Sequence, residues 1–235
     1  MFELEDRYWW FVARRQLALN LLRPKLPPNA QVLDLGCGTG VISRELSAFS
    51  DPISLDMSAK ALQYCQTRGL RECVQADGTK LPLQSGKFDA VLGLDIFEHI
   101  DDDLAAFQES FRVLNPGGQL VLSVPAFKSL WGPHDVALHH FRRYRKSQME
   151  ERLKQAGFQI DRSSYSVFFL FPVVVVSRVI EKFKSGPSRA SLPRVPYWLN
   201  SLLIKLQKME SVMIVDWKMS LPWGSSVVVV ASKPK

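Results

Sequence analysis

The stretch from residue 32 to residue 124 constrains the fold most, because short apolar runs alternate there with stretches of helical period. This alternation is typical of βαβ units built around a parallel sheet. We therefore expect a doubly wound α/β domain. The expected strands are residues 32–36, 53–56, 73–77, 88–95 and 119–124, and the expected helices are residues 41–49, 58–68 and the segment that follows residues 101–103.

The rest of the chain extends this pattern to a mostly parallel, seven-stranded sheet with helices on both faces. A helix over 147–156 leads to a strand near 158–165, and residues 225–232 form an antiparallel terminal strand. At 235 residues and 46% hydrophobic, the chain is long enough for one substantial core with an appendage. The expected parts are an N-terminal lid or helix (1–29), the core (30–166 and 221–235) and a helical, apolar and basic insertion before the last strand (167–220).

Composition and charge limit the partners only coarsely. The cysteines Cys37, Cys65 and Cys73 lack metal-type spacing and indicate reduced thiols, and the N-terminus lacks a secretory signal, so we expect a cytoplasmic protein. The net charge of +7 lies entirely in the last third, where residues 161–235 hold 11 Lys and Arg against 4 Asp and Glu. This positive excess could attract nucleic acid, an anionic membrane or an acidic substrate. It could also be no more than a solvated basic surface. The oligomeric state stays open.

A glycine-rich loop, Gly36-Cys37-Gly38-Thr39-Gly40, joins the first expected strand to its helix. Its glycines let the backbone approach a ligand closely. Asp56 follows twenty residues after Gly36, at the end of the second strand, where its carboxylate can accept hydrogen bonds from ribose hydroxyls. We infer a nucleoside site. The chain lacks the phosphate loop of nucleotide triphosphatases, and Val41 stands where the dinucleotide fingerprint needs glycine.

Five consecutive segments then resemble class I (Rossmann-like) S-adenosylmethionine-dependent methyltransferases, of the type 11 and ubiquinone-biosynthesis-like bacterial group. They are VLDLGCGTG (32–40), LDMS (55–58), QADGTKLPL (75–83), FDAVLGLDIFEHIDD (88–102) and FRVLNPGGQLVLSVP (111–125). Their order and spacing match over residues 30–125. The resemblance implies that S-adenosyl-L-methionine is the cofactor and S-adenosyl-L-homocysteine the product.

The resemblance also implies roles for individual residues. The methionine part of the cofactor would be lined by Asp34, Gly36, Cys37 and Gly38. Asp56 would hold the ribose and Met57 would pack on the adenine. Asp77 would accept from the adenine amino group, beside Gly78, and Asp95 would face the methionine end or the acceptor. Each of them could instead be only a cap or turn residue.

Methyl transfer from a sulfonium mainly requires an acceptor aligned with the breaking bond. A hydroxyl or protonated amine would also need a base, for which histidine is suited. The candidates are His99, His134, His139 and His140. His99 follows Glu98 and could instead belong to a helix-start network, whereas residues 131–146 could form a base, an anion clamp or a polar loop over the cofactor. The spacing matches no zinc pattern, so we expect no metal.

The segments outside the core should select the acceptor. The resemblance implies that Trp9, Trp10 and Arg14 form a lid over the pocket, and we expect Tyr144 as a further substrate contact. Trp10 could equally lie on the buried face of a first helix. The apolar run VFFLFPVVVV (167–176) is too short to span a membrane. The basic residues after it are Arg178, Lys182, Lys184, Arg189 and Arg194. This combination suits peripheral contact with an anionic membrane or a greasy acceptor, or else a core strand followed by a basic loop.

Three functional hypotheses follow. The first is a methyltransferase acting on a small or lipid-like molecule, with an oxygen acceptor favoured. The second, a nucleic-acid methyltransferase, is disfavoured because LDIFEH (94–99) replaces the Asn/Asp-Pro-Pro-Tyr/Phe motif after the fourth strand. The third is a nicotinamide-dependent oxidoreductase or a non-catalytic nucleoside-binding protein, which bound NAD would distinguish from the other two.

Overall fold

The computed structural model describes residues 2–182 and 195–235, which form a seven-stranded sheet in the order β3-β2-β1-β4-β5-β7-β6. Strands β1 to β5 pair in parallel, and β7 runs antiparallel to both β5 and β6. The strands are β1 (Gln31–Leu35), β2 (Asp51–Asp56), β3 (Cys73–Gln75), β4 (Phe88–Leu94), β5 (Leu114–Pro125), β6 (Gln159–Ser166) and β7 (Ser226–Ser232). The expected mixed sheet with an antiparallel terminal strand is confirmed.

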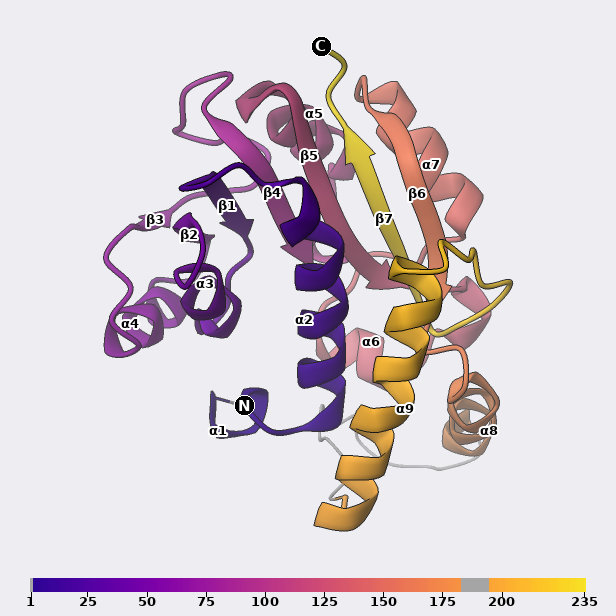
Figure 1. Cartoon of the computed structure of the whole chain (residues 1–235). Helices are drawn as coiled ribbons and strands as arrows, with labels where there is room; N and C mark the ends of the chain where they lie inside the picture. Colours follow the sequence, from indigo (N-terminus) through magenta and orange to yellow (C-terminus); the bar gives the residue numbers. More distant parts are fainter. Residues whose placement is uncertain (1, 183–194) are drawn as a thin grey trace.

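Helices cover both faces of this sheet (Figure 1). They are α1 (Phe2–Glu5), α2 (Trp9–Leu22), α3 (Val41–Leu46), α4 (Ala59–Thr67), α5 (Asp103–Val113), α6 (Pro133–Ala137), α7 (Lys146–Gln155), α8 (Phe171–Lys182) and α9 (Tyr197–Val215). Helix α2 packs on α9 and on β5, while α5 and α7 pack together on the opposite face. Helix α6, helix α8 and the N-terminal end of α2 lie beyond the edge where β4 and β5 end, and the first turns of α9 project farther from that edge (Figure 1).

The central strands are buried on both faces, which explains their nearly continuous apolar sequences. In β5, Leu120 and Leu122 belong to the core cluster that includes α5 and α7. Val121, between them, belongs to the other cluster, together with Leu21 of α2 and Ile214 of α9. Side chains alternate along a strand, so one strand contributes to both cores. The sheet is therefore a rigid support for the loops at its carboxyl edge.

The expected boundaries hold to within a few residues, with two informative differences. Strand β3 ends at Gln75, so Asp77 lies in the loop that follows it. Strand β5 begins at Leu114, directly after α5, because Leu114 pairs with Phe88 of β4 before a register shift. The glycine-containing turn therefore belongs to the start of the strand.

The insertion before the last strand is helical, but its buried face is not the expected one. The apolar run contributes a loop and then α8, whose Pro172 lies in the first turn, where proline is well tolerated. The alternative of a core strand is therefore wrong. In α9 the sequence predicts an apolar face made of Leu199, Leu202, Leu203, Leu206 and Met213. This face is only partly buried, with Leu202 53% exposed. The fully buried positions of this helix are Gln207, Glu210, Ser211 and Ile214.

The polar face of α9 is buried because it completes a neighbouring loop. The carboxylate of Glu210 accepts hydrogen bonds from the backbone N–H groups of Val167 and Phe168. A leucine here would leave those donors unpaired, which is costly in a buried position. The sequence near 185–196 is rich in proline, serine and arginine, which predicts a linker. This stretch falls almost wholly outside the described residues, as do Lys184, Arg189 and Arg194. Among the helices the structure describes, none is long and apolar enough to cross a membrane.

Candidate active site

The glycine-rich loop after β1 is held against the end of β2. The backbone N–H groups of Gly36 and Cys37 both donate to the carbonyl of Leu55, at 2.8 and 3.0 Å. Gly36 has a φ of +73°, and a Cβ there would meet the Ile96 side chain at 2.5 Å, so this glycine is required by packing. Gly38 differs, because a Cβ added to it meets nothing within 4 Å. The open side of the loop is therefore at Gly38.

Asp34 anchors this loop from beneath. Its carboxylate is buried and accepts a 2.6 Å hydrogen bond from the Ser43 hydroxyl of α3, which in turn accepts from Ser54 of β2 at 2.8 Å. Burial raises the pKa of Asp34 to about 6, although the Ser43 hydrogen bonds oppose the shift. With a pKa of about 6, Asp34 changes its charge close to neutral pH. In the same loop, the Sγ atom of Cys37 lies 3.7 Å from the Sγ atom of Cys65 in α4.

Asp56 lies where β2 ends and holds two backbone groups. Its Oδ2 accepts from the N–H of Gly38 at 2.9 Å and its Oδ1 from the N–H of Ser58 at 2.8 Å. Each carboxylate oxygen has a second lone pair, and the residue is partly exposed, so further donors can still reach it. The neighbouring Met57 is 72% exposed. The exposed thioether of Met57 lies next to the partly exposed carboxylate of Asp56, and this pair suits a ligand that has hydrogen-bond donors and a flat, apolar part.

Asp77 and Gly78 lie in the loop after β3. The Oδ1 of Asp77 accepts from both the N–H and the hydroxyl of Thr79, and these bonds lower the pKa of Asp77. A Cβ on Gly78 would meet Ile100 at 3.1 Å, so the loop packs closely against the segment after β4. The structure thus gathers the expected cofactor residues along the ends of β1, β2 and β3.

Asp95, directly after β4, joins the core to the N-terminal helix. Its carboxylate forms an ion pair with Arg14 of α2, and its N–H donates to the carbonyl of Ser123 of β5 at 2.8 Å. Asp95 has a φ of +53°, a strained conformation for a residue with a side chain. Such strain is typical of functional sites. Arg14, which the sequence predicts to be part of a lid, thus pairs directly with Asp95, one of the residues expected at the cofactor.

A pocket opens beside this ion pair, and we call it the α2–α9 pocket. Helix α2 contributes Trp9, Trp10 and Arg14, and α9 contributes Gln207 and Glu210. The remaining lining residues are Ala13, Leu17, Ala18, Ser123, Ser166, Val167, Ser226 and Val228. Trp9 and Trp10 touch edge to face, with ring centroids 5.7 Å apart. The two tryptophans therefore line a cavity, with polar side chains on its other walls.

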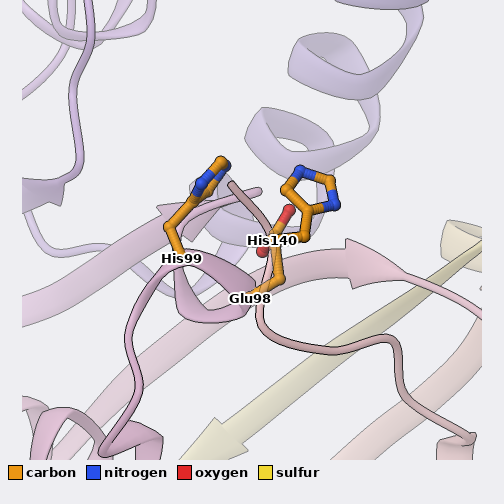
Figure 2. Close-up of side chains that lie close together, drawn as sticks. All are labelled: Glu98, His99 and His140. Atoms are coloured by element: carbon orange, nitrogen blue, oxygen red, sulfur yellow. The ribbon is translucent and has the colours of Figure 1, made fainter. Parts of the chain in front are cut away.

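The four candidate histidines separate into two groups. The rings of His99 and His140 lie edge to face with centroids 4.6 Å apart, and the buried Glu98 carboxylate lies between them (Figure 2). One ligand atom from each of these three residues lies within 4.8 Å of the others. His134 and His139 lie outside this group; His139 is exposed. We call Glu98, His99 and His140 the Glu98 cluster.

A buried carboxylate orients His140. Asp135 accepts a hydrogen bond from the Nδ1 of His140 at 3.0 Å and one from the Nε of Arg143 at 2.7 Å. Burial opposes ionisation of Asp135, but these two bonds prevail and lower its pKa. The Asp135 side chain also accepts from the N–H of Gly132, which begins α6. His140 is consequently held with its Nε2 edge away from Asp135.

Electrostatics in the Glu98 cluster favour neutral groups. Burial raises the pKa of Glu98 well above its ordinary value, and the charge of Asp95 adds to this shift. Burial lowers the pKa of His99, with a further contribution from His140. In His134 burial and Arg178 lower the pKa. Burial therefore favours the uncharged forms of Glu98 and His99, which exposed side chains at a protein surface would not experience.

Tyr144 does not contact the pocket, contrary to expectation. Its buried hydroxyl donates to the Asp103 carboxylate at 2.7 Å, and burial together with this carboxylate raises the pKa of Tyr144. Asp103 also pairs with Arg142 and Arg152. Tyr144 thus connects the segment after β5 to the start of α5. Nothing in the sequence pointed to Glu210, whereas Glu98 and Asp135 each stand beside a candidate histidine, His99 and His134.

Comparison with known proteins identifies the class. The sequence model of a methyltransferase domain family matches residues 33–122. The ubiquinone biosynthesis O-methyltransferase of Xanthomonas axonopodis pv. citri (strain 306) is 28% identical over 182 residues, which cover 65% of this chain and 76% of that protein. Its namesake in Xanthomonas oryzae pv. oryzae (strain PXO99A) is 30% identical over 131 residues, covering 49% of this chain and only about half, 55%, of that relative.

Solved structures share the fold at low sequence identity. The methyltransferase complexed with the Haloferax volcanii Trm112 methyltransferase activator superposes with a TM-score of 0.66 at 18% identity, covering 99% of this chain and 93% of that one. Haemonchus contortus phosphoethanolamine N-methyltransferase 2, in complex with S-adenosyl-L-methionine, gives 0.59 at 18%, covering 100% and 60%. The [4+2]-cyclase SpnF gives 0.64 at 17%, covering 97% and 87%. At these identities the likeness shows the fold alone.

The domain match, the named relatives and this fold together define an S-adenosylmethionine-dependent methyltransferase of the class I, Rossmann-like type. The nicotinamide-dependent oxidoreductase and the non-catalytic protein are set aside. Within the methyltransferases, the chain resembles the ubiquinone biosynthesis O-methyltransferases of Xanthomonas.

Proposed function

We propose that this methyltransferase transfers the methyl group to a hydroxyl oxygen of a small or lipid-like acceptor held in the α2–α9 pocket. The observation that carries the proposal is the position of this pocket, lined by Trp9 and Trp10 and adjoining the Arg14–Asp95 ion pair at the end of β4. The cavity measures only about 20 Å³, room for about one water, so the tryptophan wall has to move outward before an acceptor can enter. Aromatic walls with a few polar groups are typical of sites for small apolar molecules. The named relatives are O-methyltransferases, which supports oxygen as the accepting atom.

The cofactor residues proposed here are those at the ends of β1 to β4. Gly38 offers open space for a close approach, Asp56 has lone pairs for ribose hydroxyls, and Met57 exposes an apolar side chain for the adenine. Asp77 would accept from the adenine amino group. When bound, S-adenosylmethionine supplies an electrophilic methyl group on its sulfonium. Lining roles for Asp34, Gly36, Cys37, Gly78 and Asp95 belong to the same proposal.

The chain's own contribution is to orient the acceptor, exclude water and receive a proton. Trp9, Trp10 and Arg14 form one wall of the pocket, so we propose that they close over the acceptor. A hydroxyl must lose its proton as the new bond forms. The Glu98 cluster follows Asp95 in the chain, and burial lowers the pKa of His99, which keeps its imidazole neutral and able to accept a proton. We propose that His99 or His140 receives the proton.

Replacing Trp10 by alanine tests this assignment. We expect the KM for a hydrophobic phenol or alcohol to rise by about 10- to 100-fold, because a Trp wall supplies roughly 1.5–3 kcal/mol of apolar contact. The affinity for S-adenosylhomocysteine should stay within about twofold. Methyl transfer from labelled cofactor to a panel of phenols, alcohols, amines and nucleic acids measures the effect, with Trp217→Ala as an exposed control. Transfer to nucleic acid, with none to hydroxyl compounds, would contradict the proposal.

We also propose that α8 and the start of α9 contact an anionic membrane. Both elements lie beyond the carboxyl edge of the sheet (Figure 1), and their exposed apolar residues are Val173, Val176, Val179, Ile180, Tyr197 and Trp198. An apolar helix face with aromatic residues suits the boundary between headgroups and acyl chains. Arg178 adds little to this surface because it pairs with Glu181.

Vesicle co-sedimentation tests the membrane proposal. The protein should pellet with vesicles containing phosphatidylglycerol, and the double variant Val176→Asp/Trp198→Ala should lose at least about tenfold in affinity, since burying apolar surface drives the binding. Met209→Ala, which removes an exposed side chain further along α9, is the matched control. Equal binding by the double variant would exclude this surface.

A further inference from the structure

We propose that Cys37 and Cys65 form a site of reversible oxidation, at which a peroxide joins the two thiols in a disulfide and so weakens the binding of the cofactor. The chain has three cysteines, and the fold brings all of them to one small cluster. Cys37 lies in the glycine-rich loop after β1, Cys65 lies in α4, and Cys73 begins β3. Cys37 and Cys65 are 28 residues apart in the chain, so the fold and not the sequence spacing brings them together.

The sulfur atoms of Cys37 and Cys65 are already in contact. Their Sγ atoms lie 3.7 Å apart. Both also face the carbonyl oxygen of Gly38, at 3.8 Å from the Sγ of Cys37 and 3.4 Å from the Sγ of Cys65. A disulfide bond is about 2.05 Å long, so the two sulfurs have to approach each other by roughly 1.7 Å to bond. Two thiols on separate elements thus meet the first requirement for a disulfide.

The thiol pair is shielded from solvent but lies behind an opening in the loop. Cys37 is 6% exposed and Cys65 is fully buried. Gly38, which both sulfurs face, is the open side of the loop. The hydrogen bond from Cys37 lowers the pKa of Cys65, although burial opposes the shift. The thiolate is the form of cysteine that reacts with oxidants, so a small oxidant that passes Gly38 finds its reactive sulfur at Cys65.

The oxidation consumes one hydrogen peroxide molecule for each disulfide. The Cys65 thiolate attacks a peroxide oxygen, the O–O bond breaks, and the departing hydroxide takes up a proton to form water. The Cys37 thiol then attacks the sulfur of the Cys65 sulfenic acid. The S–S bond forms, the S–O bond breaks, and the hydroxyl leaves as a second water with the Cys37 proton. Two electrons pass from the sulfurs to the peroxide, and a dithiol such as dithiothreitol returns them by exchange.

The disulfide would distort the loop because the loop is already held on two sides. The N–H groups of Cys37 and Gly38 are both bonded to the end of β2. On the side of α4, a Cβ on Gly40 would meet the Sγ of Cys65 at 2.8 Å, so the backbone has no room to move toward that helix. Gly38, with a φ of +56° and open surroundings, is left to absorb the change. The oxidised loop therefore shifts where we propose that the cofactor approaches.

Peptide mapping of the oxidised full chain identifies the bond directly. Trypsin cleaves after Lys and Arg, so it releases the three cysteines in different peptides, which are residues 26–44, 61–68 and 72–80. After treatment with hydrogen peroxide and blocking of free thiols, we expect the main linked species to join 26–44 to 61–68, and dithiothreitol to separate them. S-adenosylhomocysteine at about ten times its Kd should slow this reaction about tenfold, because the bound nucleoside covers the loop.

Calorimetric titration with S-adenosylhomocysteine measures the consequence. Oxidation of the wild-type chain should lower the affinity at least about tenfold, the loss expected from one hydrogen bond between loop and ligand. Dithiothreitol should restore it. Cys65→Ser keeps a donor for the Gly38 carbonyl and should bind equally well before and after peroxide. Cys73→Ser is the matched control, because it changes a partly buried cysteine of the same cluster and should respond to peroxide as the wild type does.

Three outcomes overturn the proposal. They are no disulfide in the wild-type chain, a bond that joins 61–68 to 72–80 and leaves Cys37 free, and a bond between Cys37 and Cys65 that does not change the affinity. Circular dichroism checks that Cys65→Ser is folded, Cys65→Ala replaces it if it is not, and the mapping needs no variant. The effect on affinity rests on the proposed cofactor residues, whereas the disulfide does not. Unchanged nucleoside binding by Asp56→Ala would contradict those residues and leave the disulfide assignment intact.

Discussion

Replacing Asp56 by alanine is expected to weaken the binding of S-adenosylhomocysteine by at least about 100-fold. Two hydrogen bonds from ribose hydroxyls to a carboxylate contribute roughly 1.5–3 kcal/mol each. The substitution also frees the N–H of Gly38, which Asp56 Oδ2 accepts at 2.9 Å, so the glycine-rich loop loses its tie to the end of β2. Isothermal titration calorimetry of wild-type and variant chains measures the loss directly.

Asp51→Ala is the matched control for this experiment. Asp51 lies at the opposite end of the same strand, is exposed, and bonds the Gln31 side chain at 2.7 Å. The control should bind the nucleoside with wild-type affinity. If a well-folded Asp56→Ala chain binds within about threefold of the wild type, the ribose assignment is wrong, even though the protein is a methyltransferase.

Asp34 should give the protein a distinctive dependence of stability on pH. Its carboxyl is buried and its pKa is raised to about 6 from 3.8. Because the folded state holds this proton more tightly than the unfolded state, the stabilisation is complete below about pH 4 and is lost as the pH rises through 6. The two values differ by about two pH units, so Asp34 alone lowers the free energy of unfolding by about 3 kcal/mol across this window.

Urea denaturation at a series of pH values compares the wild-type chain with Asp34→Asn. The change in unfolding free energy between pH 4 and pH 7 should differ between the two by about 3 kcal/mol, whatever the substitution itself costs. Parallel curves for wild type and Asp34→Asn would show that Asp34 is ionised throughout. A cofactor ammonium near Asp34 should bind better above pH 6, because the carboxylate is then charged.

The core of the fold was predictable because its local signals agree with one another. The βαβ pattern over β1 to β5 follows from period-2 and period-3.6 apolar spacing. Asp102, one of the three aspartates that precede the expected helix, caps α5, while Ser58, expected as the first residue of its helix, is the cap of α4. The failure at α9 has an equally physical reason. Gln207, Glu210 and Ser211 are buried because the loop after β6 needs acceptors, and the helix's own sequence carries no sign of that loop.

The candidate site, like the fold, has one part that could be predicted from the sequence and one part that could not. Asp56 lies at the end of β2, as its spacing from Gly36 predicted, and beside Gly38, because a loop and a strand end that are close in topology are also close in space. The histidines behave differently. Only His140 of the three in the segment after β5 reaches His99, and Tyr144, expected at the substrate, bonds Asp103 instead. Those outcomes depend on how the connection from β5 to α7 folds back.

The sequence by itself therefore determined the class of fold, the strand ends at which we propose the nucleoside site, and the methyltransferase family resemblance. These depend on apolar periodicity, glycine positions and short-range order, which are properties of the chain read locally. The tertiary structure alone decided that α2 and α9 together line a pocket, that Arg14 pairs with Asp95, and that Glu98, His99 and His140 converge. Each of these joins residues far apart in the chain, and only the packing of whole elements decides which distant side chains meet.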